Sequence, residues 1–218
     1  MDYSQSGERI WGELHRMQEI VATLRMLNEN ATRCPCPFDR YIMFFTQNRW
    51  ALIEALIMGI SRITDRRKDC LHFGIVLATA RQTPPSNVKT AKLIEAQQEY
   101  DKLRRSKELK AIKNIRHETI AHAANKQDPD ECLDGVTWGE VYGVVDKLSN
   151  IFNIANDAKL WTHRVMPSAM TYVTGVGQRD LVKDTTAMIK ALETISHNEK
   201  LHSRLIRQAE EHQRVEKD

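Results

Sequence analysis

Residues 137–155 read TWGEVYGVVDKLSNIFNIA, and this stretch carries a complete helix signal. Thr137 is followed three residues later by Glu140, which is the spacing of a capping box at a helix N-terminus. Apolar residues then recur on one helical face. They are Val141, Val145, Leu148, Phe152 and Ala155. The stretch therefore predicts a helix with one buried face.

Prolines and glycines cluster at 34–37, 83–86, 128–135 and 167–177, and they divide the chain into five segments. The first segment has one apolar helical face, formed by Ile10, Leu14, Met17, Val21 and Leu24. The second has a longer stripe, which predicts a central helix with a break near residues 65–69. That stripe comprises Phe38, Ile42, Phe45, Leu52, Leu56, Ile60 and Ile63, and it is widened by Trp50, Ile53 and Ile57.

The third segment predicts two helices with a bend between them, because its apolar spacing is lost across residues 104–107. Ser106 is the expected N-cap of the second helix, and Glu108 lies in its first turn. Another helix is expected from Asp180 onward.

The composition agrees with a helical fold. Hydrophobic residues make up 41% and charged residues 28% of the 218 residues, which is typical of a globular chain. Nine glycines and six prolines are few for the turns of an all-β fold. Since no internal repeat is found, we predict an all-α, antiparallel bundle of about five to seven helices. Residues 1–165 are expected to form the bundle, and residues 166–218 a loop and an amphipathic helical extension.

The chain has no stretch that predicts secretion or membrane insertion. Its first ten residues lack a basic region followed by an apolar run, so a cytoplasmic location is expected. The most apolar stretch, Trp50 to Ile60, is shorter than the roughly 20 residues that span a bilayer. Reduced thiols are expected for Cys34, Cys36, Cys70 and Cys132. A lone C-x-C at 34–36 lacks the ligand set of a zinc site, so neither a metal nor a cofactor is expected.

Positive charge is concentrated between residues 101 and 116, although the net charge of the chain is only +3. Seven basic residues face two acidic ones there, so a polyanion should be drawn to this region. The basic residues are Lys102, Arg104, Arg105, Lys107, Lys110, Lys113 and Arg116. An ordinary solvated helix face would have the same charge pattern.

The residues that follow are suited to phosphate chemistry. Arg116 can clamp phosphate oxygens, while His117 and His122 can transfer protons near neutral pH. A zinc-protease motif needs histidines four apart, whereas these two are five apart and diverge by about 140° on an α-helix. Glu118 and His122 also have the spacing of a plain helix-surface pair. On a continuous α-helix, Arg116 and His122 are about 120° apart and do not converge automatically.

Arg116-His117 followed by His122 resembles the R-x(4–6)-H signature of the HEPN superfamily, with five residues intervening here. The run NIRHETIAH (114–122), the helix ALIEALIMGISRITD (51–65) and the helix beginning at Thr137 together are similar to its abortive-infection branch. The resemblance covers about residues 7 to 160. It implies an all-helical, metal-independent endoribonuclease that works as a homodimer with its active site at the interface. It also implies a toxin or phage-defence effector with a cognate antitoxin.

Within that interpretation, His122 is the expected acid–base residue for attack of an RNA 2′-hydroxyl on the adjacent phosphate. Arg116 is expected to stabilise charge on the phosphate oxygens. His117 and Glu118 have supporting roles, and Lys110, Lys113 and Lys126 are candidate contacts to the RNA backbone.

A different class of function stays open, namely a catalytically inactive helical module that binds protein or nucleic acid through the same basic surface. The four tryptophans are expected in the core rather than in base stacking. They are Trp11, Trp50, Trp138 and Trp161.

Overall fold

The computed structural model describes residues 2–33, 35–65, 72–121, 131–161 and 181–215. Eight α-helices and no strand occur within these ranges, and the helices pack antiparallel, which confirms the predicted all-α bundle. They are α1 (Tyr3–Arg33), α2 (Pro35–Arg40), α3 (Ile42–Thr64), α4 (Phe73–Gln82), α5 (Thr90–Arg104), α6 (Lys107–Ile115), α7 (Trp138–Asp157) and α8 (Leu181–Val215). A π-helical turn, η1 (Arg116–Ala121), continues from α6, and a 3₁₀ turn, η3 (Glu131–Leu133), precedes α7.

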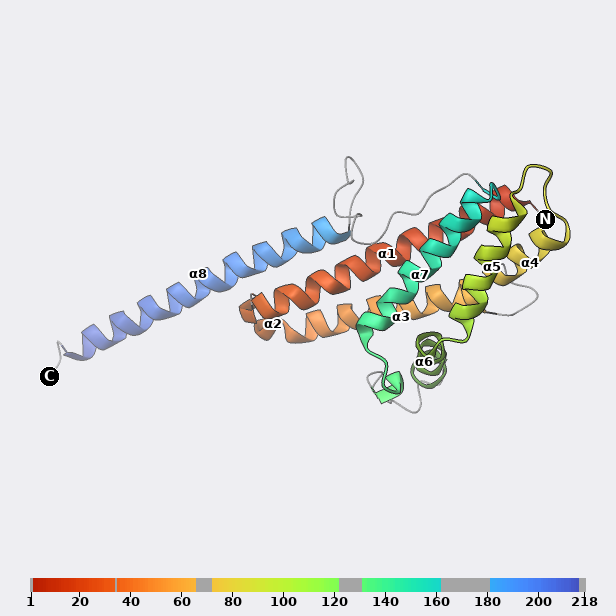
Figure 1. Cartoon of the computed structure of the whole chain (residues 1–218). Coiled ribbons are helices and arrows are strands. Elements are labelled where there is room, and N and C mark those ends of the chain that lie inside the picture. Colours follow the sequence, from red (N-terminus) through yellow and green to blue (C-terminus); the bar gives the residue numbers. More distant parts are fainter. Residues whose placement is uncertain (1, 34, 66–71, 122–130, 162–180, 216–218) are drawn as a thin grey trace.

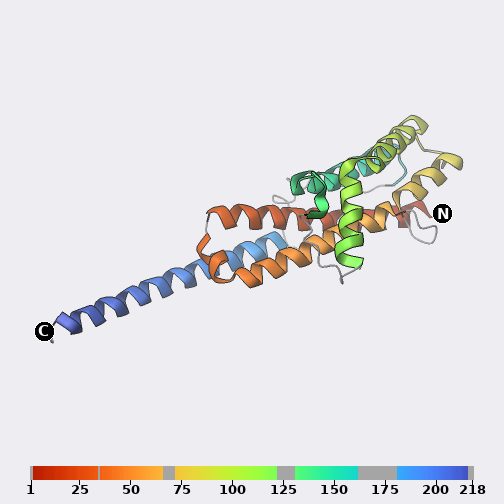
Figure 2. The same cartoon turned by 90° about the horizontal axis from the view of Figure 1, so that it is seen from below.

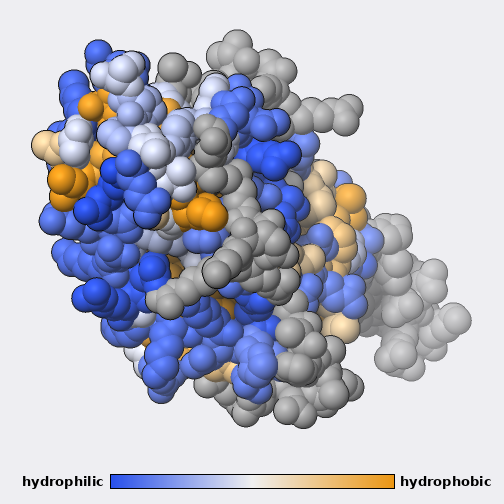
Figure 3. Space-filling model, turned by 90° about the vertical axis from the view of Figure 1, so that its right-hand side faces the viewer, coloured by the Kyte–Doolittle hydropathy of each residue, from blue (hydrophilic) through white to orange (hydrophobic). Residues whose placement is uncertain are grey.

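The long helices α1 and α3 lie side by side along the bundle (Figure 1). Helix α7 packs on α1 and on α5, and α4 packs against α5 at one end. Helix α6 runs across the direction of α1 and α3, as the view from below shows (Figure 2). The predicted face of α1 is confirmed, because all five of its residues are at most 1% exposed. The bundle end seen in Figure 3 is largely hydrophilic, with apolar residues in small separate patches.

The predicted central helix is wrong at its beginning. Tyr41 has non-helical backbone angles (φ −111°, ψ 34°) and separates the short α2 from α3. Ile42, which the stripe placed in the core, is 60% exposed, whereas Leu56, Ile57 and Ile60 are fully buried. The reason is position, since the buried α3 residues of the main apolar cluster begin at Ile53, whereas Ile42 lies in the first turn of α3, beside α2. The later stripe residues, from Ile53 to Ile63, are buried in the main apolar cluster.

The predicted break at residues 34–37 is also only partly correct, because Pro35 and Pro37 lie inside the first turn of α2. Proline is tolerated there, since the first N–H groups of a helix have no intrahelical partner to lose. The predicted end of α3 is confirmed at Asp65, the C-cap residue.

The two predicted N-caps are confirmed. The Thr137 side chain accepts a hydrogen bond from the Glu140 amide (3.2 Å), and Glu140 Oε2 accepts one from the Thr137 amide (2.8 Å). Ser106 Oγ accepts one from the Leu109 amide (3.3 Å) and begins α6. The two caps therefore fix the residues at which α7 and α6 begin.

The tryptophans are core residues or pack against the core. Trp161 is 5% exposed, donates from Nε1 to the Phe152 carbonyl (3.1 Å) and stacks on the Phe152 ring at 4.5 Å. The other three are half-buried against the main apolar cluster. Cys132 is buried and is not part of a disulfide, whereas the side chains of Cys34, Cys36 and Cys70 lie outside the described residues.

Helix α8 packs on α1 and α2 and then extends beyond the bundle (Figures 1 and 2). Its Ile189 is buried with Met26, Leu27 and Phe45 in a second, smaller apolar cluster. The predicted helix after Asp180 is thus confirmed, while residues 166–180 lie outside the described part. None of the described helices is apolar over a length that would cross a bilayer.

Candidate active site

Helix α6 is held in place by a narrow apolar face. Leu109, Ile112 and Ile115 recur at spacings of three residues and are each at most 1% exposed. Lys110 and Lys113 alternate with them and are exposed. This burial fixes the helix against α3 and α7 while its basic side chains remain in solvent. The predicted basic face of α6 is therefore present.

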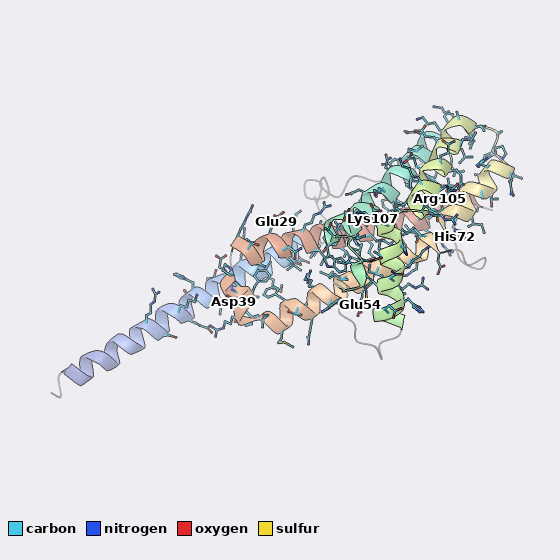
Figure 4. The ribbon with its side chains drawn as sticks, turned by 60° about the horizontal axis from the view of Figure 1, so that its bottom comes forward. Glu29, Asp39, Glu54, His72, Arg105 and Lys107 are labelled. Carbon is cyan, nitrogen blue, oxygen red and sulfur yellow. The ribbon has the colours of Figure 1, made fainter. Side chains whose placement is uncertain are left out.

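Ion pairs neutralise part of the basic cluster and tie α6 to α7. Lys147 Nζ donates to Glu108 Oε1 (2.9 Å) and holds the pKa of that carboxyl below its usual value. Lys107 Nζ lies 2.8 Å from Glu140 Oε1 and is the main cause of lowering the Glu140 pKa to about 2. Arg104 also has an acidic neighbour, Asp101, at 3.7 Å. The α5–α6 junction around Lys107 is visible in Figure 4.

Four basic residues of the cluster remain exposed, and none has an ion pair within the described part of the chain. They are Lys102, Arg105, Lys110 and Lys113. Ion pairs therefore neutralise part of the positive charge between residues 101 and 116, and the four exposed basic side chains retain the rest.

At Arg116 the helix changes type. Residues 116–121 form a π-helical turn with i→i+5 hydrogen bonding, directly after the α-helical residues 107–115. α-Helical angles therefore do not apply from Arg116 to Ala121. His122 lies outside the described residues, so its angle to His117, which was used against a zinc-protease motif, stays a prediction. Metal ligation gains no support from this change, because the described residues contain no group of three His, Cys, Asp or Glu side chains suited to a metal.

Arg116 is bound by a residue from another helix. Its Nη1 donates to Asp65 Oδ2 (3.1 Å), and the two side chains are 30% and 31% exposed. Asp65 is the C-cap of α3, and α3 contacts the π-turn directly. The pair thus joins the end of α3 to the first residue of the π-turn across 51 positions of sequence.

His72 lies near the same carboxylate. It is the N-cap of α4, and its Nδ1 accepts a hydrogen bond from the Ile75 amide (3.2 Å). Burial lowers the pKa of His72, and the nearby charge of Asp65 offsets part of this effect. Its position at the start of α4 is labelled in Figure 4. The end of α3 therefore places an acid beside Arg116, and the start of α4 places an imidazole near that acid.

Comparison with known proteins identifies the family. The model of the HEPN_AbiU2 family, described as AbiU2, matches residues 7–162. The chain belongs to the AbiU2 branch of the HEPN superfamily. No curated protein and no solved structure matches the chain. The resemblance seen in the sequence is confirmed over nearly the same residues, and Arg116 with its π-turn lies inside the matched HEPN region.

The structure places the other predicted site residues unevenly. His117 is 66% exposed, and its Nε2 lies 3.9 Å from Oε1 of the adjacent Glu118, which is 39% exposed. Both remain candidates for supporting roles in the HEPN site. His122 and Lys126 lie outside the described residues, so the predicted approach of His122 to Arg116 stays a prediction.

Sequence reasoning missed Asp65 and His72. In the sequence, Asp65 marks only the end of the central helix, and His72 lies in a segment without a motif. Neither the charge pattern nor the spacing connects them to the HEPN signature, because the link depends on how α3 and α6 pack. The only sequence signal was the position of Asp65 at the end of the helix that resembles the family.

Proposed function

We propose that this HEPN protein is a metal-independent endoribonuclease that acts in phage defence. The observation that carries the proposal is the placement of Arg116, whose partly exposed guanidinium is held on one side while it begins a π-turn that ends directly before His122. π-turns occur frequently at functional sites. Membership of the AbiU2 family supports the same conclusion.

In the proposed reaction, the RNA 2′-hydroxyl attacks the adjacent phosphorus and the bond from phosphorus to O5′ breaks. The products are a 2′,3′-cyclic phosphate and a 5′-hydroxyl end. His122 accepts the 2′ proton or donates a proton to the leaving O5′, a role that contributes about 10²–10⁴-fold. Arg116 stabilises the charge on the non-bridging oxygens with N–H donors that stay charged at every working pH.

The test is cleavage of RNA by the purified protein in excess EDTA, with products separated by the chemistry of their ends. Arg116→Ala and His122→Ala are each expected to lose about 10²-fold or more. Arg33→Ala is the matched control, because Arg33 is exposed at the far end of α1. Cleavage that both site variants retain would identify a contaminating nuclease and contradict the proposal.

Arg116→Lys separates charge from geometry at the same position. Lysine keeps the positive charge but lacks the planar fork that binds a phosphate at two points. We expect Arg116→Lys to fall close to Arg116→Ala in cleavage rate. A lysine variant with full activity would show that a point charge is sufficient and that the assigned role is wrong.

The second candidate is an inactive binding module, and it is favoured by the four exposed basic residues that have no ion pair with any residue the structure describes. It predicts RNA binding that weakens with salt and no cleavage. Charge-removing changes at Lys110 and Lys113 should weaken RNA binding under either function. Loss of cleavage in the site variants with unchanged binding supports the nuclease.

Homodimerisation, with both subunits lining the site, and a cognate antitoxin belong to the same proposal. They rest on the HEPN family, and light scattering during size-exclusion chromatography tests the dimer. A monomer that cleaves RNA at full rate would remove the interface from the mechanism.

A further inference from the structure

Asp65 is fixed by the buried C-terminal end of α3. It is the residue at which α3 ends, and its amide donates to the Ser61 carbonyl (2.8 Å) before the chain becomes extended (ψ 150°). The last turns of α3 are anchored by Ile60 and Ile63, which are 0% and 3% exposed. The backbone of Asp65 therefore has little freedom, and its carboxylate is presented at a defined place.

The contact between Asp65 and Arg116 uses only part of the guanidinium. A guanidinium has five N–H donors, and one nitrogen, Nη1, meets Asp65 Oδ2 at 3.1 Å. Within the described ranges, Nε and Nη2 have no partner. The arginine side chain is 30% exposed, so the remaining donors are accessible from solvent. Asp65 thus restrains Arg116 without covering the whole fork.

Holding the Arg116 side chain in one place before substrate binds would favour the proposed reaction. A free arginine side chain samples many rotamers, and ordering it on substrate binding opposes reaction. Arg116 also begins a π-turn, so its own helix supplies a less regular support than α6 does. An anchor from α3 ties the guanidinium to the core of the bundle instead. Groups held in the productive geometry before substrate arrives contribute most to catalysis.

We propose that Asp65 is a positioning residue, which holds the Arg116 guanidinium by one nitrogen so that its other donors face the scissile phosphate. This inference rests on the proposed function of Arg116 and adds a residue from outside the HEPN signature. The opposite role is that of a competitor, in which the carboxylate occupies the place of the phosphate. The two roles predict opposite signs when the carboxylate is removed.

The kinetic test compares Asp65→Asn and Asp65→Ala with Asp101→Asn. Asp101 is a matched control, because it also lies beside an arginine, Arg104, but away from Arg116. For a positioning residue, kcat should fall about 10²-fold in Asp65→Ala with a smaller change in KM. Asp65→Asn keeps an acceptor oxygen and should recover part of kcat. An Asp65→Ala variant that cleaves as fast as, or faster than, the wild type would overturn the proposal.

A second measurement is independent of cleavage. The order of the Arg116 Nε–Hε group is measured by ¹⁵N NMR relaxation, with the signal assigned by its loss in Arg116→Lys. A restrained side chain in the wild type and a mobile one in Asp65→Ala support the anchor. A mobile Arg116 in the wild type overturns it, whether or not any variant folds. If the wild type cleaves no RNA, the proposed function fails while the relaxation result still decides the anchor.

Discussion

Two glycines on α1 should respond in opposite ways to the same substitution. A Cβ added at Gly7 would lie 2.8 Å from Cβ and 3.1 Å from Cγ of Trp161, whereas a Cβ added at Gly12 meets no heavy atom within 4 Å. Alanine is favoured over glycine inside a helix by about 1 kcal/mol. Gly12→Ala is therefore expected to stabilise the protein by up to about 1 kcal/mol.

At Gly7 the same gain is opposed by overpacking. Trp161 cannot easily move away, because its ring is held between two others. The centroid of the Trp161 ring lies 4.5 Å from that of the stacked Phe152 ring and 6.3 Å from that of Phe73, in a T-shaped arrangement. Its Nε1 hydrogen bond to the Phe152 carbonyl also fixes the ring. Forcing an extra methyl group into such a site costs about 1–3 kcal/mol. Gly7→Ala should thus be neutral to destabilising by about 2 kcal/mol, after the helix gain is subtracted.

The assay is reversible thermal unfolding followed by circular dichroism. For a chain of this size, 1 kcal/mol shifts the midpoint by about 2–4 °C. Gly12→Ala should melt a few degrees above the wild type, and Gly7→Ala should melt at or below it. Gly143→Ala on α7 is a second control, because no atom lies within 4 Å of its added Cβ. Equal stabilisation by Gly7→Ala and Gly12→Ala would refute the reasoning about Trp161.

Three further predictions concern the supports of the site. Ser106→Ala should lower stability by about 1 kcal/mol while Ser106→Asp retains the cap, and equal melting midpoints would contradict this. Lys147→Met should lower the melting midpoint at neutral pH, and the difference from the wild type should shrink below about pH 4.5, because protonation of Glu108 then removes the pair from the wild type, as the substitution has already done in the variant. For His72, the lowered pKa means that the unfolded chain binds the proton first as pH falls below about 6.5. The wild type should therefore lose more stability than His72→Asn between about pH 7.5 and 5.5 in urea unfolding, and parallel losses would contradict the assignment.

The local part of the fold could be predicted from the sequence. Capping by Ser106 and by Thr137 depends on residues three positions apart, and the buried face of α1 depends on simple helical spacing. Such signals act within one or two turns of chain. The HEPN family could also be recognised from the sequence, because the signature at Arg116 and the order of the helices around it are both visible along the chain.

The parts that depend on packing were not accessible in the same way. Ile42 has the spacing of a core residue, but it is exposed because the main apolar cluster does not extend to the first turn of α3. The π-turn at Arg116 differs from an α-helix in its hydrogen bonds and not in the types of residue that it contains. The apolar periodicity of the sequence therefore does not reveal it. Asp65 meets Arg116 only after two helices have packed, and spacing rules do not extend over 51 positions. The signature around Arg116 is therefore visible in the local sequence. The contact between Arg116 and Asp65 arises only in the folded bundle.

The π-turn is a place where deleting a single residue would change the geometry of the candidate site. A π-turn is equivalent to one residue inserted into an α-helix, so deleting a single residue such as Thr119 would let the α-helical ladder of α6 continue without interruption. The buried contacts of α6 precede the deletion and would stay as they are, and the wide turn that holds the extra residue would become an ordinary α-helical turn. One codon removed would therefore shorten the interval between Arg116 and His122 from five residues to four and remove the π-turn, while every side chain proposed for chemistry is retained.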